Sequence, residues 1–291
     1  MPGQGLREIR RLLTEAGLVP QQRLGQHFMI DQNLLRKLAA VADLRAADTV
    51  LEVGPGTGSL TELLLTYGCR VVAVEVDRGL QALLRERLGG ETRFTLVQAD
   101  VLAGKHRVNP LVLKVLEEQP PQAGGAYKLV SNLPYQIATP LLIDLLLIRP
   151  RFERLVCTIQ KEVGQRLVAA AREELYGPAS VLAQTLAEVK LHAIIPPQAF
   201  WPRPRVESVM LTIRPRSDDR VEVRDVPGFA AFVQRAFQQR RKMLRRVLRE
   251  VGEAELLMAC QRVGISVEAR PEELTPAAWR RLFAALRPHS G

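Results

Sequence analysis

Short apolar runs alternate with amphipathic stretches along the first two thirds of the chain. The apolar runs predict strands at 49–53, 70–76, 92–97, 128–131 and 155–160. The stretches between and after them carry apolar residues every three or four positions and predict helices at 60–67, 79–88, 109–118, 140–148 and 163–171. Regular alternation of this kind is typical of an α/β fold, in which helices cover both faces of a parallel sheet.

The two ends of the chain have a different pattern. Residues 6–16 have helical spacing, and Asp31 stands where it can cap the start of a second helix. Over 215–227 the composition becomes charged and poor in strand-forming residues, and beyond it the pattern is helical throughout. We therefore predict an α/β domain over 1–215 and a small all-helical domain over 216–291.

Charge and cysteine content narrow the class of protein. The chain of 291 residues has a net charge of +10 and a pI near 10.1, which favours a polyanionic partner such as nucleic acid, although a solvated basic surface is the simpler alternative. Its three cysteines are odd in number and widely spaced, so the sequence predicts neither a disulfide framework nor a metal site. No apolar run has membrane-spanning length and no signal-peptide core is visible, so we expect a cytoplasmic protein without a membrane partner.

A glycine-rich loop follows the first predicted strand of the sheet. Gly54, Gly56 and Gly58 give the spacing G-P-G-T-G, which departs from the G-x-G-x-x-G fingerprint of a pyrophosphate site. S-adenosylmethionine carries no phosphate and is compatible with such a loop. Glu75 ends the next strand and can bind ribose hydroxyls, while Asp100 ends the third strand and can hold the adenine amine. The alternative is an ordinary tight turn followed by two capping acids.

The fourth strand runs directly into Asn132-Leu133-Pro134-Tyr135. An exocyclic amine on adenine is a poor nucleophile because its lone pair is delocalised into the ring. Two acceptors aimed at the amine hydrogens would favour the reactive form, and the Asn132 side-chain oxygen with the Leu133 or Pro134 carbonyl are suitable. Proline holds the backbone direction, and the Tyr135 ring offers a face on which a flipped base can stack. The alternative is a turn at the end of a strand.

A basic run lies near the start of the predicted helical domain. Arg241, Arg245 and Arg249 recur at four-residue spacing, with Lys242 and Arg246 beside them. On a helix these side chains would share one face suited to phosphates. A solvated charged face is the alternative interpretation.

Several motifs in order make the chain resemble the KsgA-type ribosomal RNA adenine N6,N6-dimethyltransferases. Besides the two motifs above, the matching segments are 25–29 (G-Q-H-F-M), 160–168 (Q-K-E-V followed by R-L-V), 199–206 (A-F-W-P-R-P-R-V) and 237–242 (F-Q-Q-R-R-K). The resemblance covers nearly the whole chain. It implies a Rossmann-like class I S-adenosylmethionine-dependent methyltransferase domain with a small helical C-terminal domain that recognises RNA.

The resemblance also assigns residues to roles. It implies that Gln26, His27 and Met29 close over S-adenosyl-L-methionine, with Asn132 beside them, and that Phe200 faces Tyr135 across the flipped adenine. We expect RNA contacts from basic side chains in the segments 199–206 and 237–242 and from one arginine after them. These residues are Arg203, Arg205, Arg241, Lys242 and Arg245.

Three departures from the family pattern stand out. His27 replaces the usual asparagine, Arg246 replaces an asparagine that often closes the basic run, and the segment 105–125 is longer than usual.

The implied reaction is two successive methyl transfers to N6 of two adjacent adenines near the 3′ end of small-subunit (16S) ribosomal RNA, by a monomer that takes part in small-subunit maturation. Three rivals remain. A large-subunit methyltransferase of the resistance type shares the motifs, a non-catalytic assembly factor could keep the fold, and a DNA adenine methyltransferase would more often have Asp where this chain has Asn132.

Overall fold

The computed structural model describes residues 4–104, 107–148, 150–216, 223 and 225–286. The chain divides into two compact units, which we describe separately. The first comprises Met1–Gly164 and Lys190–Pro215, and the second Gln165–Val189 and Arg216–Gly291. The predicted domain limits stay a prediction, but one segment of the predicted α/β range, Gln165–Val189, packs in the second unit.

In the described part of the chain, seven strands form one sheet in the order β4-β3-β2-β5-β6-β9-β7. Their bounds are Thr49–Val53 (β2), Arg70–Glu75 (β3), Phe94–Gln98 (β4), Tyr127–Asn132 (β5), Phe152–Gln160 (β6), Ala187–Ile195 (β7) and Ser208–Pro215 (β9). β2 pairs in parallel with β3 and β5, β3 with β4, and β5 with β6, whereas β9 is antiparallel to β6. The Rossmann-like α/β class is confirmed.

The sheet is not parallel throughout, because β9 runs antiparallel to its neighbour β6. Parallel neighbours need a long crossover connection, usually a helix. Residues 196–207 connect β7 to β9 and hold only the 3₁₀ turn Pro197–Ala199 and the two-residue strand β8 (Phe200–Trp201). This connection contains no crossover helix, in keeping with a β9 that runs antiparallel to β6.

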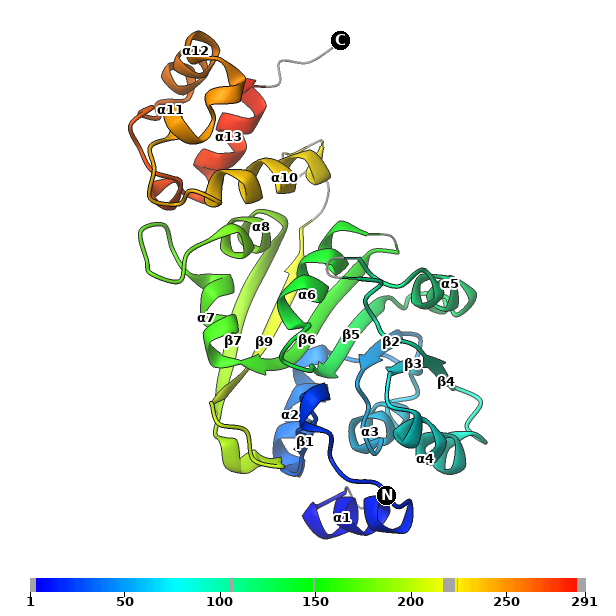
Figure 1. Cartoon of the computed structure of the whole chain (residues 1–291). Helices are drawn as coiled ribbons and strands as arrows, with labels where there is room; N and C mark the ends of the chain where they lie inside the picture. Colours follow the sequence, from blue (N-terminus) through cyan, green and yellow to red (C-terminus); the bar gives the residue numbers. More distant parts are fainter. Residues whose placement is uncertain (1–3, 105–106, 149, 217–222, 224, 287–291) are drawn as a thin grey trace. The chain divides into compact units, whose positions relative to one another are not determined.

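The helices of the first unit alternate with the strands, as Figure 1 shows. Their bounds are Leu6–Glu15 (α1), Gln32–Ala42 (α2), Ser59–Thr66 (α3), Arg78–Leu88 (α4), Pro110–Glu118 (α5) and Ala138–Leu147 (α6), and the next helix, Lys161–Val168 (α7), begins in the first unit and ends in the second. Asp31 caps α2 as predicted, because its carboxylate accepts from the amides of Asn33 and Leu34. α2 and α3 pack over a layer of β-branched residues, among them Val50 and Val130, that forms one face of the sheet. Packing on this apolar layer holds the strands in place, and polar residues gather at their carboxyl ends.

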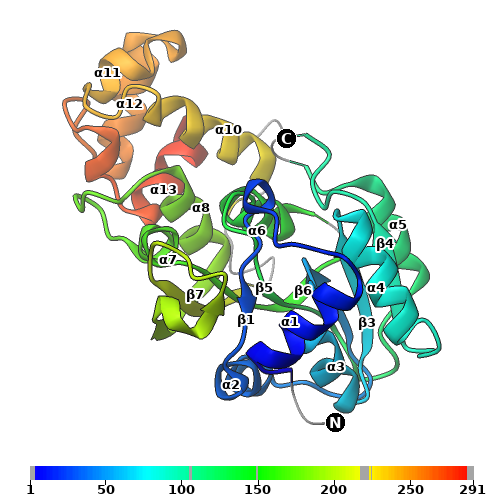
Figure 2. The same ribbon diagram turned by 60° about the horizontal axis from the view of Figure 1, so that its bottom comes forward.

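A second, two-stranded sheet was not foreseen. β1 (Phe28–Met29) pairs antiparallel with β8, in the register Phe28 with Trp201 and Met29 with Phe200. A strand of two residues is too short to show an alternating pattern. The pairing brings the N-terminal G-Q-H-F-M segment beside the proline-rich segment at 199–206. In the view of Figure 2, β1 follows directly on the loop after α1.

The second unit is helical in its C-terminal part. The helices are Pro178–Leu186 (α8), Val226–Phe237 (α10), Leu244–Val247 (α11), Glu253–Val263 (α12) and Pro276–Leu286 (α13). Its core is aromatic: the Phe232 ring lies 5.7 Å from Trp279 and 5.5 Å from Phe283, measured between centroids.

The expectation that one helix carries the basic run is wrong. α10 ends at Phe237, so Arg241 and Lys242 lie in the following turn, while Arg245 belongs to the four-residue α11 and Arg249 opens a 3₁₀ turn. Met243 is extended, which interrupts the helical pattern between the two helices. The arginines and Lys242 are all exposed, but they do not share a helix face.

Candidate active site

Polar residues from both sequence motifs meet at the carboxyl ends of the parallel strands. A cavity of about 110 Å³ lies there, in the first unit. Its lining includes every residue predicted for cofactor binding or catalysis: Gln26, His27, Met29, Gly54, Gly56, Glu75, Asp100, Asn132, Leu133, Pro134 and Tyr135. Ligands of open α/β sheets bind in this position, outside the carboxyl ends of the strands.

The glycine loop is built for close approach. Gly56 has a φ of +60°, and a Cβ atom added to it would lie 2.8 Å from Cε1 of Phe28. Gly54 also has a positive φ, and its amide donates to the carbonyl of Val74 over 2.9 Å. Any other residue at Gly56 would have to displace the Phe28 ring and adopt a backbone conformation that side chains disfavour. The loop and the N-terminal segment therefore form one wall of the cavity.

Glu75 lies beside this loop at the end of β3. One carboxylate oxygen accepts from the amides of Val76 and Asp77, each over 2.9 Å, and the other lies 3.4 Å from the amide of Gly56. Burial raises the pKa of Glu75 to about 7, and nearby Asp77 adds to the rise, against the lowering effect of these amides. A carboxylate so placed can accept hydrogen bonds from two neighbouring hydroxyl groups.

The neighbouring acids have different surroundings. The side chain of Asp77 caps α4 and accepts from Gln21 over 2.6 Å and from Gln26 over 2.9 Å. Gln26 is thereby tied to the start of α4. Asp100 is exposed, and its carboxylate accepts from the amide of Leu102 over 2.9 Å. One oxygen of Asp100 is therefore used in a local turn, as in a capping interaction.

Asn132 is held at both ends of its amide. Its nitrogen donates to the His27 carbonyl over 2.8 Å, and its oxygen accepts from the Thr158 hydroxyl over 2.5 Å. The His27 carbonyl can only accept, so the orientation of the amide is determined. The Thr158 carbonyl also accepts from the Leu133 amide over 3.1 Å. Thr158 is buried on β6 and was missed, because a single threonine in a strand carries no motif.

Tyr135 is fixed through its hydroxyl group and its ring. The hydroxyl lies 2.6 Å from the Ser208 Oγ, and the ring centroid lies 5.6 Å from that of His27, with the planes tilted by 31°. Burial raises the pKa of the Tyr135 phenol, which therefore stays protonated. His27 Nδ1 in turn lies 2.7 Å from the Pro202 carbonyl, which requires a proton on Nδ1.

A second cavity of about 440 Å³ opens on the other side of these two rings. It is lined by Gln26, His27, Tyr135, Gln160 and the segment from Pro202 to Val206. Gln26, His27 and Tyr135 line both cavities, so the two spaces meet at these side chains. The predicted RNA contacts Arg203 and Arg205 are exposed at the second cavity.

Phe200 lies apart from the residues predicted with it. It is 2% exposed, belongs to the core cluster with Met29, and is absent from the linings of both cavities. The sequence motif placed it near the site correctly, through β8, but its ring faces the core. Its predicted stacking on a base stays a prediction.

Among the residues that the structure describes, no group of three or more His, Cys, Asp or Glu side chains could hold a metal ion. None of the described helices is both long enough and apolar enough to cross a membrane.

The fold is that of the class I methyltransferases, and the cavity lies where ligands of such sheets bind. A crystal structure of the 23S rRNA methyltransferase ErmE matches 89% of this chain and 99% of its own length, with a TM-score of 0.63 and 25% identity. A dimethyladenosine transferase from Plasmodium falciparum shares the fold, with a TM-score of 0.68 at 20% identity over 88% of this chain and 96% of its own.

Sequence comparison is more specific. The chain belongs to the ribosomal RNA adenine dimethylase family, whose model matches residues 20–287. Two relatives are each 39% identical and carry the name ribosomal RNA small subunit methyltransferase A. The protein from Moorella thermoacetica aligns over 90% of this chain and 91% of its own, and the protein from Magnetococcus marinus over 97% of each. The family suggested by the motifs is confirmed.

Proposed function

We propose that this protein uses S-adenosyl-L-methionine to dimethylate N6 of two adjacent adenines near the 3′ end of small-subunit (16S) ribosomal RNA, as a cytoplasmic monomer that takes part in small-subunit maturation. The observation that carries the proposal is the fixed amide of Asn132, which lines the first cavity and donates to the carbonyl of His27, a residue that lines both cavities. The names of the relatives support the small subunit as the substrate.

The first cavity fits the cofactor. At Gly56 the space that a Cβ would fill is taken by the Phe28 ring, which closes this wall of the cavity, and Glu75 offers a carboxylate for the ribose hydroxyls. Asp100 and the Gln26 to Met29 segment complete the residues that would hold the adenine and the amino-acid part. When bound, S-adenosylmethionine would supply the methyl group.

The chain's own contribution at the amine is positioning and polarisation. The Asn132 oxygen already accepts from Thr158 and retains a second lone pair for an amine hydrogen. The Pro134 carbonyl accepts from the Ile137 amide over 3.2 Å, which leaves the Leu133 carbonyl as the better second acceptor. Two acceptors would draw both hydrogens out of the ring plane and expose the nitrogen lone pair. After the transfer, the positively charged amine is acidic and loses its proton without a strong base.

The second cavity fits a nucleotide extruded from its stack. A base in it would lie against the ring of Tyr135, while Arg203 and Arg205 would bind the flanking phosphates. We assign Arg241, Lys242 and Arg245 in the second unit to more distant RNA contacts, since all three are exposed. Without a shared helix face, these side chains would bind phosphates individually.

The test uses purified protein, methyl-labelled S-adenosylmethionine and unmethylated small ribosomal subunits, with the RNA then digested to nucleosides. Wild type should yield N6,N6-dimethyladenosine, and Asn132→Ala should yield none above background. Asn33→Ala, which alters an exposed asparagine outside the site, is the matched control and should retain activity. Label in large-subunit RNA alone would favour the resistance-type reaction. RNA binding without label in either subunit would favour a non-catalytic assembly factor.

A further inference from the structure

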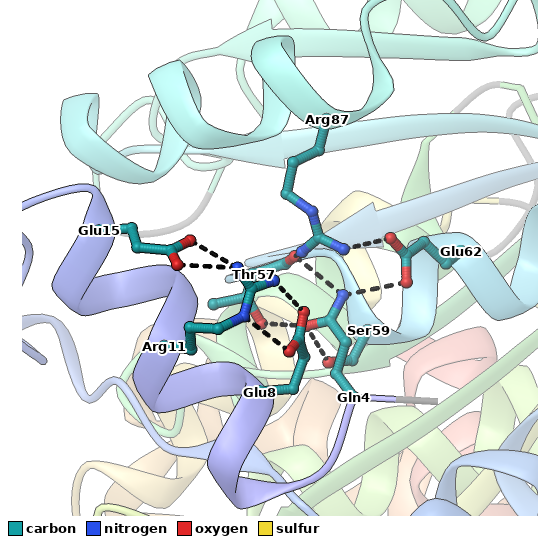
Figure 3. Close-up of polar contacts among 8 residues, drawn as sticks. All are labelled: Gln4, Glu8, Arg11, Glu15, Thr57, Ser59, Glu62 and Arg87. Atoms are coloured by element: carbon teal, nitrogen blue, oxygen red, sulfur yellow. Dashed lines mark hydrogen bonds and ion pairs between the residues drawn. The ribbon is translucent and has the colours of Figure 1, made fainter. Parts of the chain in front are cut away.

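The segment before α1 inserts one polar side chain into the first unit. Gln4 is 2% exposed, although it precedes the first helix and belongs to no recognised motif. Figure 3 shows its amide pointing at Thr57 of the glycine loop and at Ser59 and Glu62 of α3, the helix that follows the loop. Burying an amide is unfavourable unless its hydrogen bonds are replaced, so the contacts of Gln4 must be accounted for.

The amide of Gln4 is fully satisfied. Its nitrogen donates to the Thr57 carbonyl over 3.2 Å and to a Glu62 oxygen over 3.0 Å. Its oxygen accepts from the Thr57 hydroxyl over 2.7 Å and from the Ser59 hydroxyl over 2.8 Å. A primary amide has two N–H donors and two lone pairs, so all four are used. Such a set of partners determines the orientation of the side chain and of the loop together.

A second side chain reinforces the same loop. Arg87 of α4 donates to the Thr57 carbonyl over 2.7 Å and pairs with the other oxygen of Glu62 over 2.5 Å. Figure 3 shows Arg87 and Gln4 meeting at Thr57 from different elements. The carbonyl of Thr57 therefore receives two donors, and its peptide group cannot rotate without losing both.

The residues held in this way line the first cavity. Thr57 and Ser59 belong to its lining, whereas Gln4 and Arg87 do not. The helix that follows Gln4 acts on the same loop from another side, because Ile9, Leu12 and Leu13 of α1 pack in a cluster with Phe28, whose ring covers Gly56. The N-terminal segment thus holds the glycine loop both directly and through Phe28.

We propose that Gln4 is a positioning residue for the cofactor, which fixes the backbone of residues 56–59 in the conformation that binds S-adenosylmethionine. The proposal rests on the function proposed above. It assigns Gln4 no contact with the cofactor or the RNA. Its loss weakens cofactor binding because the loop must then be ordered at the expense of binding free energy. If Gln4 only anchored α1 to the first unit, its loss would instead lower the stability of the fold and leave the affinity for the cofactor unchanged.

The experiment compares Gln4→Ala, Gln4→Glu and the double variant Gln4→Glu/Glu62→Gln, in the full chain. Gln4→Glu places a carboxylate against the Thr57 carbonyl and Glu62, whereas the double variant restores a donor from position 62 to position 4. Arg11→Ala is the control, since Arg11 lies exposed on α1 and pairs only with Glu8 and Glu15 of the same helix in the described contacts. Affinity for S-adenosylhomocysteine is measured by titration calorimetry well below each variant's Tm.

We expect Gln4→Ala to weaken S-adenosylhomocysteine binding about tenfold, and Gln4→Glu more. The KM for S-adenosylmethionine should rise in parallel, while kcat at saturation and the KM for small subunits stay near wild type. The double variant should recover most of the affinity, and this rescue keeps the test valid even if Gln4→Ala folds poorly.

Three results would contradict the inference in different ways. Wild type that binds S-adenosylhomocysteine, with both single variants within about twofold of it, would overturn the role of Gln4 and leave the proposed function intact. Wild type that fails to bind S-adenosylhomocysteine would overturn the proposed function itself. A loss of affinity that the double variant does not restore would also reject the amide contacts as the cause.

Discussion

Buried carboxylates lie at both ends of the central strands, and their surroundings shift their pKa values in opposite directions. At the amino end of β2, Asp48 pairs with the Lys128 ammonium over 2.7 Å, and both side chains are 0% exposed. Burial by itself would raise the pKa of Asp48, but Lys128 and the amides of Arg45 and Ala126 outweigh it and lower the pKa. The charge at this end is fully compensated.

At the carboxyl end, burial dominates. It raises the pKa of Glu52 to about 8, despite a hydrogen bond from Thr61, and the pKa of Glu75 to about 7. Among the residues that the structure describes, neither glutamate has a lysine or arginine partner. A buried acid paired with its cation supports the fold, whereas a buried acid without one is available to a ligand. The contrast separates the structural end of the sheet from the functional end.

The largest effect is expected when the ion pair between Asp48 and Lys128, at the amino end of β2, is broken. Lys128→Met leaves the Asp48 carboxylate buried without its cation, and should lower the free energy of unfolding by about 3–5 kcal/mol. Chemical denaturation at neutral pH measures it. Lys114→Met, which removes an exposed partner of Glu118, should change little. Equal stability of the two variants would mean that the buried pair does not hold this end together.

The same kind of change at the functional end should act on binding. Glu75→Gln removes the carboxylate proposed for the ribose hydroxyls and should weaken S-adenosylhomocysteine binding by about 2–3 kcal/mol, as for a lost hydrogen bond to a charged group. The free energy of unfolding should fall by no more than about 1 kcal/mol. Calorimetric titration and denaturation are made on the same preparation. A large loss of stability with normal binding would reverse the assignment of the two ends.

Titration should separate the ends further. Glu75 must ionise to accept two hydroxyls, so affinity for S-adenosylhomocysteine should fall as pH drops below 7, by up to about tenfold per pH unit. Glu75→Gln is the control and should lose this dependence. A wild-type affinity that stays constant between pH 8 and pH 6 would exclude ionisation of Glu75 on binding.

Stability should respond to pH with opposite signs at the two ends. The folded pKa of Glu52 is raised, so its contribution to stability is present below its unfolded pKa and is lost as pH rises through about 8. The folded pKa of Asp48 is lowered, so its contribution is present above its unfolded pKa and is lost as pH falls through the folded value. Glu52→Gln should reduce the decline in the free energy of unfolding as pH rises from the unfolded pKa to about 8, a decline to which Glu75 also contributes, and should keep the loss at acid pH. A decline of unchanged size would assign it to Glu75 and other groups.

The smallest effect is expected for the neutral hydrogen bond between Thr158 and Asn132, at the carboxyl end of the strands. Thr158→Val removes the hydroxyl that donates to the Asn132 oxygen and should lower kcat about tenfold, since the amide loses one of its two fixed contacts. Affinity for S-adenosylhomocysteine should stay near wild type. Thr158→Ser keeps the donor and should retain most of the activity. A serine variant as slow as the valine variant would point to packing of the methyl group as the cause.

Most of the fold was predictable because its elements are long enough to show a pattern. The central strands and their helices follow hydrophobic periodicity, and the glycine loop and the Asn132 to Tyr135 motif sit where strands end. Long-range pairings of very short elements carry no such signal, so β1 and β8 were missed, as was the inward direction of Phe200. The basic run was misjudged because four-residue spacing is equally compatible with turns.

Single polar residues that act through others were also beyond prediction. Gln4 and Thr158 belong to no motif, and each is defined by partners far along the chain or on a neighbouring strand. For Thr158 one weak signal existed: it is a polar residue within the apolar run 155–159 of β6, and β6 lies beside the strand that ends at Asn132. For Gln4 the sequence offered none.

The contact between His27 and Pro202 joins residues 175 positions apart in the chain. The wall shared by the two cavities therefore needs residues from near the start of the chain and from its last third. During synthesis, a nascent chain that already contains the glycine loop and the Asn132 motif still lacks Pro202, and cannot hold His27 in place. Competence for methyl transfer thus arrives only after residues 199–206 have left the ribosome.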